Sequence, residues 1–392
     1  MAIHPVRQQP RRFGVRAPSA PAQINKHHGF RSNQTFQPLP DATGAYPYHF
    51  GLEDFLPSAA VDSIRSAGTL AFHVVGDTGG VKFPEPQQIV AMKLADDLNR
   101  TGGPIPSFMY ILGDLIYFNG EASEYYPQFY EPYAHYAAPI LAIPGNHDGD
   151  PVDLTVPSLA AFVNNFCATA PHITVEAQEV IRDAMTEPNV YWTLSAPFMT
   201  MIGLYTNVPE GGRLDGDQID WLTEELRTAP TNAALAVCTH HPIYSADAQH
   251  GGSSYLAGVL DKAIDDSGRI PDLVFSGHVH NYQRFSRPIG GRQVPYVVNG
   301  AGGYWHLHYV AKDDTGNTVS PPWSVPDTDL TLESYVDTRH GFLRLEASAT
   351  SVTGTYLTVP RPQESWHAPA EVHDRFVVDL RSHTVTTTAQ PV

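Results

Sequence analysis

The chain has 392 residues, of which 42% are hydrophobic, so it can bury a substantial core and global disorder is excluded. With 24 Lys and Arg against 41 Asp and Glu, its formal net charge of −17 argues against nucleic acid or an anionic membrane surface as a main partner, because both need a basic surface. A small phosphorylated substrate is compatible with this charge, since bound cations can reverse the local field.

The cysteine content and the hydropathy pattern exclude two further classes of protein. The two cysteines, Cys167 and Cys238, cannot form a disulfide framework or a thiolate metal site, and we expect both to be free thiols in the core. No run of the sequence approaches the roughly 18 apolar residues of a membrane span.

Residues 1–66 are predicted to form an N-terminal extension, either a loosely ordered arm or a strap along the body of the protein. The first 40 residues contain no acid and six basic residues, which are Arg7, Arg11, Arg12, Arg16, Lys26 and Arg31. No hydrophobic signal region is visible here, so the cytoplasm is the default compartment, and a secreted or periplasmic location would require that a leader had been removed.

After this extension, short apolar runs alternate with polar groups. Five such runs are typical of strands that are buried on both faces, and they lie at 70–75, 107–112, 139–143, 233–238 and 272–275. Each run is followed by a turn-forming residue and then by side chains that can bind a metal ion. Because sites in α/β proteins gather beyond the carboxyl ends of strands, the five ends predict one shared site.

The segments between these runs predict the remaining elements. Apolar residues recur at helical intervals over 86–99 and 217–226. β-Branched and aromatic residues indicate a second sheet over 191–205, 294–298 and 341–359. Residues 150–190 resemble an inserted helical cap. With no visible repeat or linker, we expect 67–392 to be one catalytic domain.

The side chains at the strand ends are hard oxygen donors and borderline nitrogen donors, namely Asp77, Asp114, Tyr117, Asn146, His240, His278 and His280. A set without thiolate favours Fe, Mn or Zn. The Tyr117 phenol, with an ordinary pKa near 10, ionises at neutral pH only beside a strongly Lewis-acidic cation, which favours Fe(III) there. Two coordination spheres can be completed if one carboxylate is shared, and Asp114, close to Tyr117, is the expected bridge.

Two neighbouring cations lower the pKa of a bound water, hold a phosphate by its oxygens and stabilise the attacking and leaving groups. His147 directly follows Asn146 and is expected to face the substrate. We assign it to transition-state stabilisation or to protonation of the leaving alkoxide, with Asp148 orienting it.

Taken in chain order, these motifs resemble the calcineurin-like metallophosphoesterase superfamily. They are Gly76-Asp77-x-Gly79, Gly113-Asp114-x-x-Tyr117, Gly145-Asn146-His147-Asp148, Val237-x-x-His240 and Gly277-His278-x-His280. Many relatives have a histidine two residues after the first aspartate. This chain has Gly79 there, and Tyr117 would supply the missing ligand, which makes purple acid phosphatases the most similar group. Gln283 replaces the glutamate that is usual in this group.

The resemblance implies a four-layer α/β/β/α sandwich of two mixed sheets flanked by helices. It implies that Asp77, Asp114, Tyr117 and His280 bind the ferric ion. It implies that Asp114, Asn146, His240 and His278 bind a divalent ion of Fe, Mn or Zn. It also suggests His250 as a substrate contact and implies a hydrolase that splits phosphomonoesters by attack of a metal-bound hydroxide.

Several alternatives are open at this point. The chain could be a phosphodiesterase with two divalent ions that acts on nucleotides or lipids, or a metal- or phosphate-binding protein without turnover. His241 is expected to be a neighbour of the centre rather than a ligand, because His-x-Pro is the family register. The oligomeric state, the pH optimum and the physiological substrate do not follow from the sequence.

Overall fold

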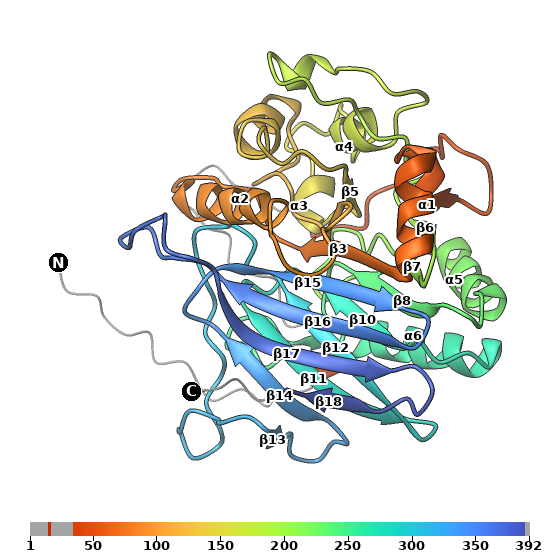
Figure 1. Ribbon diagram of the computed structural model, residues 1–392, viewed down its shortest axis with the longest axis vertical. Coiled ribbons are helices and arrows are strands. Elements are labelled where there is room, and N and C mark those ends of the chain that lie inside the picture. The colour runs from red at the N-terminus through yellow and green to blue at the C-terminus, as the bar shows by residue number, and fades with distance from the viewer. Residues whose placement is uncertain (1–14, 17–33, 389–392) are drawn as a thin grey trace.

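The computed structural model describes residues 15–16 and 34–388, and these residues form two large mixed sheets that pack face to face (Figure 1). The first sheet has nine strands. In spatial order they are β13 (Trp323–Ser324), β14 (Thr331–Val336), β11 (Tyr282–Ile289), β12 (Arg292–Asn299), β10 (Leu273–Ser276), β8 (Ala234–Thr239), β7 (Met199–Gly203), β6 (Trp192–Ala196) and β2 (His49–Gly51). The four strands β12, β10, β8 and β7 run parallel to one another.

The second sheet has seven strands and is parallel at one end only. In spatial order they are β18 (Val385–Thr387), β17 (Glu371–Asp379), β16 (Ser351–Thr358), β15 (Gly341–Ser348), β3 (Thr69–Val75), β4 (Met109–Ile111) and β5 (Ile140–Ala142). Strands β3, β4 and β5 are parallel, whereas β15 to β18 form an antiparallel meander that joins β3.

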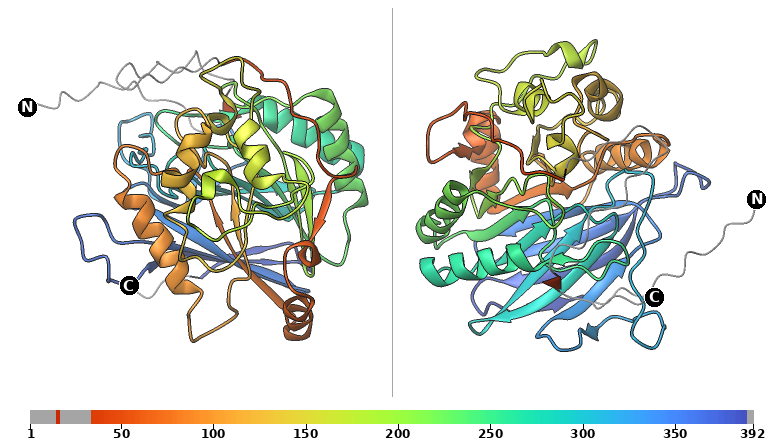
Figure 2. Two further views of the ribbon diagram at one scale, coloured as in Figure 1. Left: turned by 90° about the horizontal axis from the view of Figure 1, so that it is seen from above. Right: turned by 180° about the vertical axis from the view of Figure 1, so that it is seen from behind.

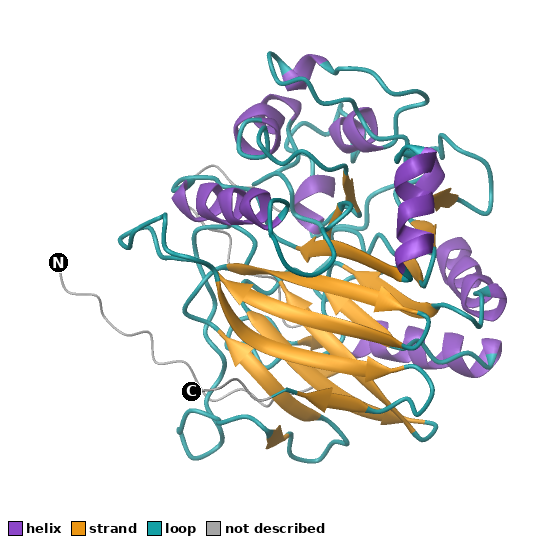
Figure 3. Ribbon diagram, viewed as in Figure 1, coloured by secondary structure: helices purple, strands orange, loops and turns teal. Residues whose placement is uncertain are grey.

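Helices and short helical turns lie beside the nine-stranded sheet and at the end of the sandwich that carries the loops (Figure 3). The α-helices are α1 (Ser58–Ala67), α2 (Glu85–Asp97), α3 (Asn146–Gly149), α4 (Ala160–Phe166), α5 (Gly216–Thr228) and α6 (Ser254–Ser267). Short turns of 3-10 helix lie at Leu52–Asp54, Ala122–Glu124 and Val175–Ala177, and one π-helical turn lies at Tyr126–Tyr130. Helices α5 and α6 lie side by side against the nine-stranded sheet (Figure 2).

The side chains of the parallel strands alternate between two apolar layers. On β8, Ala236 and Cys238 pack between the two sheets, whereas Leu235 and Val237 pack outward in the layer that includes α5 and α6. All four are buried. A strand with helices on one face and a second sheet on the other has no solvent-facing side, which explains the unbroken apolar runs in the sequence. The α/β fold with two mixed sheets and flanking helices is therefore confirmed.

The five predicted strands are all present, as β3, β4, β5, β8 and β10, but they divide between the two sheets. The strands predicted over 191–205, 294–298 and 341–359 are also present, but they do not form one second sheet among themselves. Strands β6, β7 and β12 join β8 and β10, whereas β15 and β16 join β3, β4 and β5. An apolar run shows that a strand is buried and carries no information about its neighbour, so the sequence could not make this assignment. The two predicted helices are present as α2 and α5.

The N-terminal part of the chain can be compared with its prediction only in places, because residues 1–14 and 17–33 lie outside the described residues. The short strand β1 (Val15–Arg16) pairs in parallel with β9 (Gly252–Ser253). Residues 34–66 include β2, which pairs with β6, and most of α1. The division at residue 66 and the cap at 150–190 remain predictions.

Two further expectations concern the cysteines and membrane spans. Cys167 and Cys238 are both buried and free, as predicted. Among residues 15–16 and 34–388, no helix is both long and apolar enough to cross a membrane.

Candidate metal centre

The predicted donor side chains come from loops at the carboxyl ends of five strands, and these ends meet where the two sheets meet. The loops after β3, β4 and β5 carry Asp77, Asp114, Tyr117 and Asn146, and the loops after β8 and β10 carry His240, His278 and His280. The structure therefore brings all seven side chains to one end of the sandwich.

Hydrogen bonds between the loops hold the two sheets in this relation. Asp77 Oδ2 accepts a bond from the backbone N–H of His278 at 2.7 Å. His240 Nδ1 lies 2.8 Å from the carbonyl oxygen of Leu112, at the end of β4. Each contact joins a group from one sheet to a group from the other, so the donors are placed by the fold itself.

A first group of donors surrounds the Tyr117 hydroxyl. This oxygen lies 3.3 Å from Asp77 Oδ1 and 3.2 Å from His280 Nε2. His280 Nε2 lies 3.5 Å from the same carboxylate oxygen. All three side chains are buried. One phenol, one carboxylate and one imidazole thus face a common point.

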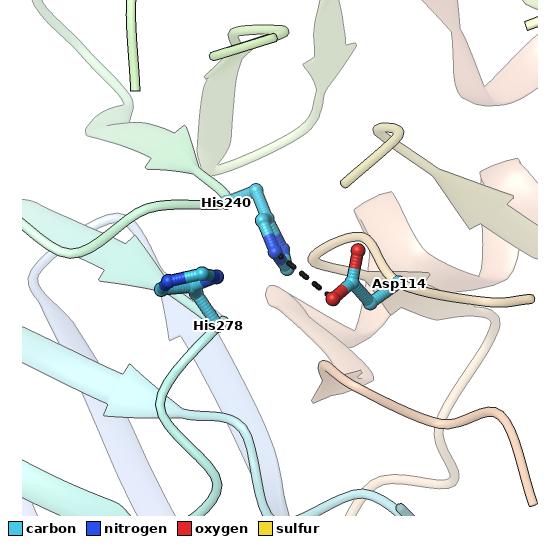
Figure 4. A group of neighbouring side chains, drawn as sticks. All are labelled: Asp114, His240 and His278. Carbon is cyan, nitrogen blue, oxygen red and sulfur yellow. Dashed lines mark ion pairs between the residues drawn. The ribbon is translucent and has the colours of Figure 1, made fainter. Parts of the chain in front are cut away.

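A second group gathers around the Asn146 side chain. Its Oδ1 lies 3.0 Å from both His240 Nε2 and His278 Nδ1, and His240 Nε2 lies 3.3 Å from Asp114 Oδ2. Figure 4 shows Asp114, His240 and His278 converging from three separate loops. Their ligand atoms all lie within 4.8 Å of one another, a spacing that could hold a metal ion.

Backbone carbonyls fix which ring nitrogen of two histidines faces each group. A carbonyl oxygen only accepts, so the nitrogen beside it must carry the proton. Leu112 O accepts the Nδ1 proton of His240, so Nε2 is the ligand atom of that ring. His306 O lies 3.0 Å from Nδ1 of His280, so Nε2 is the ligand atom there as well. Such partners are typical of metal-binding histidines.

Three of the candidate ligands have a left-handed backbone, with φ of 57° at Asp77, 54° at Asp114 and 65° at His278. Non-glycine residues in this region cost roughly 1–3 kcal/mol each and cluster at functional sites. The strain persists because the surrounding loops are anchored on both sheets. The left-handed backbone turns the chain at each of these residues, just beyond the end of its strand.

The buried charges are only partly balanced within the protein. Burial raises the pKa of Asp77. Burial also opposes ionisation of Asp114, but His240, His147 and His278 together outweigh it and lower that pKa. Burial raises the pKa of Tyr117 well above its ordinary value, and Asp114 and Asp77 raise it further. These buried acidic groups repel one another, and cations between them would relieve that repulsion.

Gly79 makes room for Tyr117. A Cβ at residue 79 would lie 2.7 Å from Tyr117 Cδ2, 2.7 Å from the carbonyl oxygen of Leu115 and 2.6 Å from Gln128 Oε1. Gln128 in turn accepts from the backbone N–H of Tyr117 at 2.9 Å. The Tyr117 ring can therefore occupy its position because residue 79 has no side chain.

His147 and Asp148 lie on α3, next to these groups. The ring of His147 lies against Tyr117, with 4.6 Å between centroids, and its Nδ1 lies 2.7 Å from the carbonyl oxygen of Phe118. Asp148 accepts from the backbone N–H groups of Leu115, Ile116 and Gly145 at 2.8–3.3 Å. Its carboxylate therefore joins the loop after β4 to the loop after β5. The role of Asp148 in orienting His147 remains a prediction.

His250 lies close to the centre, and a residue that the sequence analysis missed accompanies it. Its Nδ1 lies 2.9 Å from Glu210 Oε1, and its ring lies 4.8 Å from that of His278, centroid to centroid. Glu210, His250 and His278 form a second group whose spacing could hold a metal. Glu210 follows β7, the parallel neighbour of β8, but seven residues beyond the strand end. The one available signal was an acid before Gly211-Gly212, which is too common to single out.

His241 packs against the ring of His278, with 4.4 Å between centroids, but its Nδ1 faces another partner. Its Nδ1 lies 2.8 Å from Thr206 Oγ1, whereas His240 faces Asp114 and Asn146. The two donor groups could hold a pair of cations. The donor set is oxygen and nitrogen without sulfur, which suits iron, manganese or zinc.

Comparison with known proteins agrees with this geometry. The profile of the calcineurin-like phosphoesterase family matches residues 70–282, more than half of the chain. The chain is 24% identical over 289 residues to purple acid phosphatase 18 of Arabidopsis thaliana, which covers 66% of this chain and 60% of that protein. It is 30% identical over 135 residues to purple acid phosphatase 21 of the same plant, covering 31% of this chain and 28% of the relative. The chain thus spans only part of the length of these relatives.

Solved structures show the same fold at low identity. The purple acid phosphatase PPD1 from yellow lupin (Lupinus luteus) seeds matches with a TM-score of 0.53 and 16% identity, over 79% of this chain and 54% of that chain. A structure of PhoD matches with a TM-score of 0.52 and 13% identity, over 83% and 72%. These two likenesses concern the arrangement of sheets and helices.

The packing of Gly79 against Tyr117 gives a first prediction. In Gly79→Ala, the added methyl group would meet a backbone oxygen and a ring that has no room to retreat, and such overpacking costs about 1–3 kcal/mol. We expect the variant to melt at a lower temperature than the parent, as measured by differential scanning calorimetry.

Gly258→Ala is the matched control. Gly258 lies on an exposed face of α6, and a Cβ there meets nothing within 4 Å. Alanine at this position should stabilise the helix by about 0.5–1 kcal/mol. Equal melting temperatures for Gly79→Ala and the parent would contradict the packing argument.

Proposed function

Since this chain belongs to the calcineurin-like phosphoesterase family, we propose that it is a phosphatase that uses two metal ions to hydrolyse phosphomonoesters. The observation that carries the proposal is the pair of donor groups around Tyr117 and Asn146. Asp114, whose Oδ2 lies 3.3 Å from His240 Nε2, would be the ligand that the two ions share.

The donors differ in the ions they suit. Asp77, Tyr117 and His280, together with Asp114, would hold a ferric ion, because a buried phenol ionises only beside a strongly Lewis-acidic cation. Asn146, His240 and His278, also with Asp114, would hold a divalent ion of Fe, Mn or Zn. When bound, such a pair supplies Lewis-acid charge to phosphoryl oxygens and makes water a nucleophile near neutral pH.

His147 would act on the substrate through Nε2. Phe118 O takes the Nδ1 proton, so Nε2, once protonated, is the ring nitrogen that can donate to a phosphoryl oxygen or give its proton to the leaving alkoxide. The backbone N–H of His147 donates to Asp114 Oδ1 at 2.9 Å, so the ring is tied to the shared carboxylate. Asp148 fixes the backbone on both sides of this contact.

His250 would contact the substrate beside the divalent group, because its ring lies 4.8 Å from that of His278, centroid to centroid. Glu210 accepts the Nδ1 proton of His250, and in the doubly protonated ring the Nε2–H can donate to a phosphoryl oxygen. Two imidazoles would then add hydrogen bonds to a small phosphorylated substrate. We propose no nucleic-acid partner, in view of the charge of −17.

The ferric part of the proposal predicts a visible absorption band. The protein purified with iron should be violet, because a tyrosinate bound to Fe(III) absorbs in the visible range, and Tyr117→Phe should remove this band. Tyr304→Phe is the matched control, because the Tyr304 ring lies 4.2 Å from that of Tyr117 and 4.5 Å from that of His280, centroid to centroid. A band that survives in Tyr117→Phe and disappears in Tyr304→Phe would show that Tyr304, and not Tyr117, supplies the phenolate.

The monoester part is tested by comparing two substrates with the same leaving group. We expect the protein loaded with metal to hydrolyse p-nitrophenyl phosphate with a higher kcat/KM than bis(p-nitrophenyl) phosphate. Asp114→Asn, which weakens the shared ligand, should lower both rates and controls for a contaminating hydrolase. Faster cleavage of the diester would favour a phosphodiesterase, and two bound ions without turnover of either ester would indicate a binding protein.

A further inference from the structure

The three histidines of the donor groups are not oriented in the same way. His240 and His280 each give the proton of the second ring nitrogen to a backbone carbonyl, Leu112 O and His306 O. His278 faces Asn146 with Nδ1, and its buried Nε2 has no hydrogen-bond partner within 3.5 Å among the described residues. This Nε2 lies 3.7 Å from Glu210 Oε1.

From this difference we infer that Glu210 is a positioning residue, which holds His278 in the tautomer that presents Nδ1 to the divalent ion and holds His250 toward the substrate through the same oxygen. The inference rests on the proposed function and adds to it a residue outside the seven donors. A carboxylate that accepts the second proton of a metal-binding imidazole fixes the orientation of the ring and raises its basicity. A small rotation of either side chain would bring His278 Nε2 within hydrogen-bond distance of Glu210 Oε1.

Glu210 is well placed for this role because it is both enclosed and anchored. Only 12% of its side chain is exposed. Its Oε1 lies 2.9 Å from His250 Nδ1, so one carboxylate oxygen serves both rings. The rings of His250 and His278 also contact each other, with 4.8 Å between centroids. Movement of Glu210 would therefore disturb a metal-binding ring and a substrate-binding ring together.

The N-terminal part of the chain holds the loop that carries Glu210. The backbone N–H of Glu210 lies 3.2 Å from Gln34 Oε1. Asn207 receives a bond from the N–H of Gln37 at 2.8 Å and donates to its carbonyl oxygen at 3.0 Å. The segment 34–37 thus fixes the 207–210 loop from outside, which gives this part of the extension a role in the geometry of the centre.

A third metal ion among Glu210, His250 and His278 is the competing explanation, since their spacing permits one. It would require His278 to bind two ions through its two nitrogens, and therefore to lose both ring protons. A carboxylate acceptor needs only the ordinary neutral tautomer of the ring, so positioning is the simpler assignment.

The test uses the full chain with one equivalent of Fe(III), into which Mn²⁺ is titrated. We expect Glu210→Ala to weaken Mn²⁺ binding by about 10–100-fold, the usual effect of removing the partner of a metal-binding histidine. The violet band should stay, because the ferric group does not include His278. Glu210→Gln, whose amide oxygen can still accept the Nε2 proton, should restore most of the affinity.

Glu225→Ala is the matched control. Glu225 accepts from His49 Nε2 at 2.9 Å, at the edge of the nine-stranded sheet, so the same pair of residue types is broken away from the centre. Its Mn²⁺ affinity should equal that of the parent, even if its melting temperature falls.

A second readout needs no metal. In the metal-free protein labelled with ¹⁵N-histidine, we expect His278 to be protonated on Nε2 in the parent and in Glu210→Gln, and to show mixed tautomers in Glu210→Ala, with its signal assigned from His278→Asn. This measurement tests the contact between Glu210 and His278 even if the parent binds no pair of metal ions. A failure to bind metal would overturn the proposed function but not the contact.

Three results would overturn the inference about Glu210. The first is that Glu210→Ala leaves both the Mn²⁺ affinity and the tautomer of His278 unchanged. The second is that Glu210→Ala loses the violet band together with Mn²⁺ binding. The third is that the parent binds three ions per chain.

Discussion

The centre depends on the bond between the backbone N–H of His278 and Asp77 Oδ2, because it joins the two sheets at the point where the donors meet. Asp77 follows β3 in the seven-stranded sheet and His278 follows β10 in the nine-stranded sheet. The other oxygen of Asp77 remains beside Tyr117 and His280. One carboxylate therefore fixes the distance between the sheets and takes part in the first donor group. Both residues hold a left-handed backbone, whose strain the packed sheets counteract.

The arrangement separates the charged interior into two halves with different chemistry. Around Tyr117 the donors are a carboxylate, a phenol that ionises next to a strong Lewis acid, and one imidazole, whereas around Asn146 they are an amide and two imidazoles. Asp114, the proposed shared ligand, has one oxygen beside His240 and accepts from the backbone N–H of His147 with the other. A hard trivalent ion and a softer divalent ion are thus suited to opposite sides of one carboxylate. The proposal of two unlike metals rests on this asymmetry.

The sequence singled out seven side chains that the structure brings to one end of the sandwich, because each closely follows an apolar run in the chain. It could not predict which sheet each strand joins, since pairing depends on partners far along the chain, as with β3 and β15. Glu210 was missed for a related reason, because seven residues separate it from β7 and its partners lie at residues 250 and 278. Gly79 was recognised as unusual, but the reason, a phenol ring in the space of its absent side chain, is visible only in three dimensions.

The central claim is that one carboxylate, Asp114, serves two metal ions, and metal analysis of Asp114→Ala tests it most directly. The parent protein should contain two ions per chain by inductively coupled plasma mass spectrometry, including one iron. Asp114→Ala should lose both, because the two donor groups would then lose the carboxylate that they share. Retention of two ions per chain by Asp114→Ala would contradict the account.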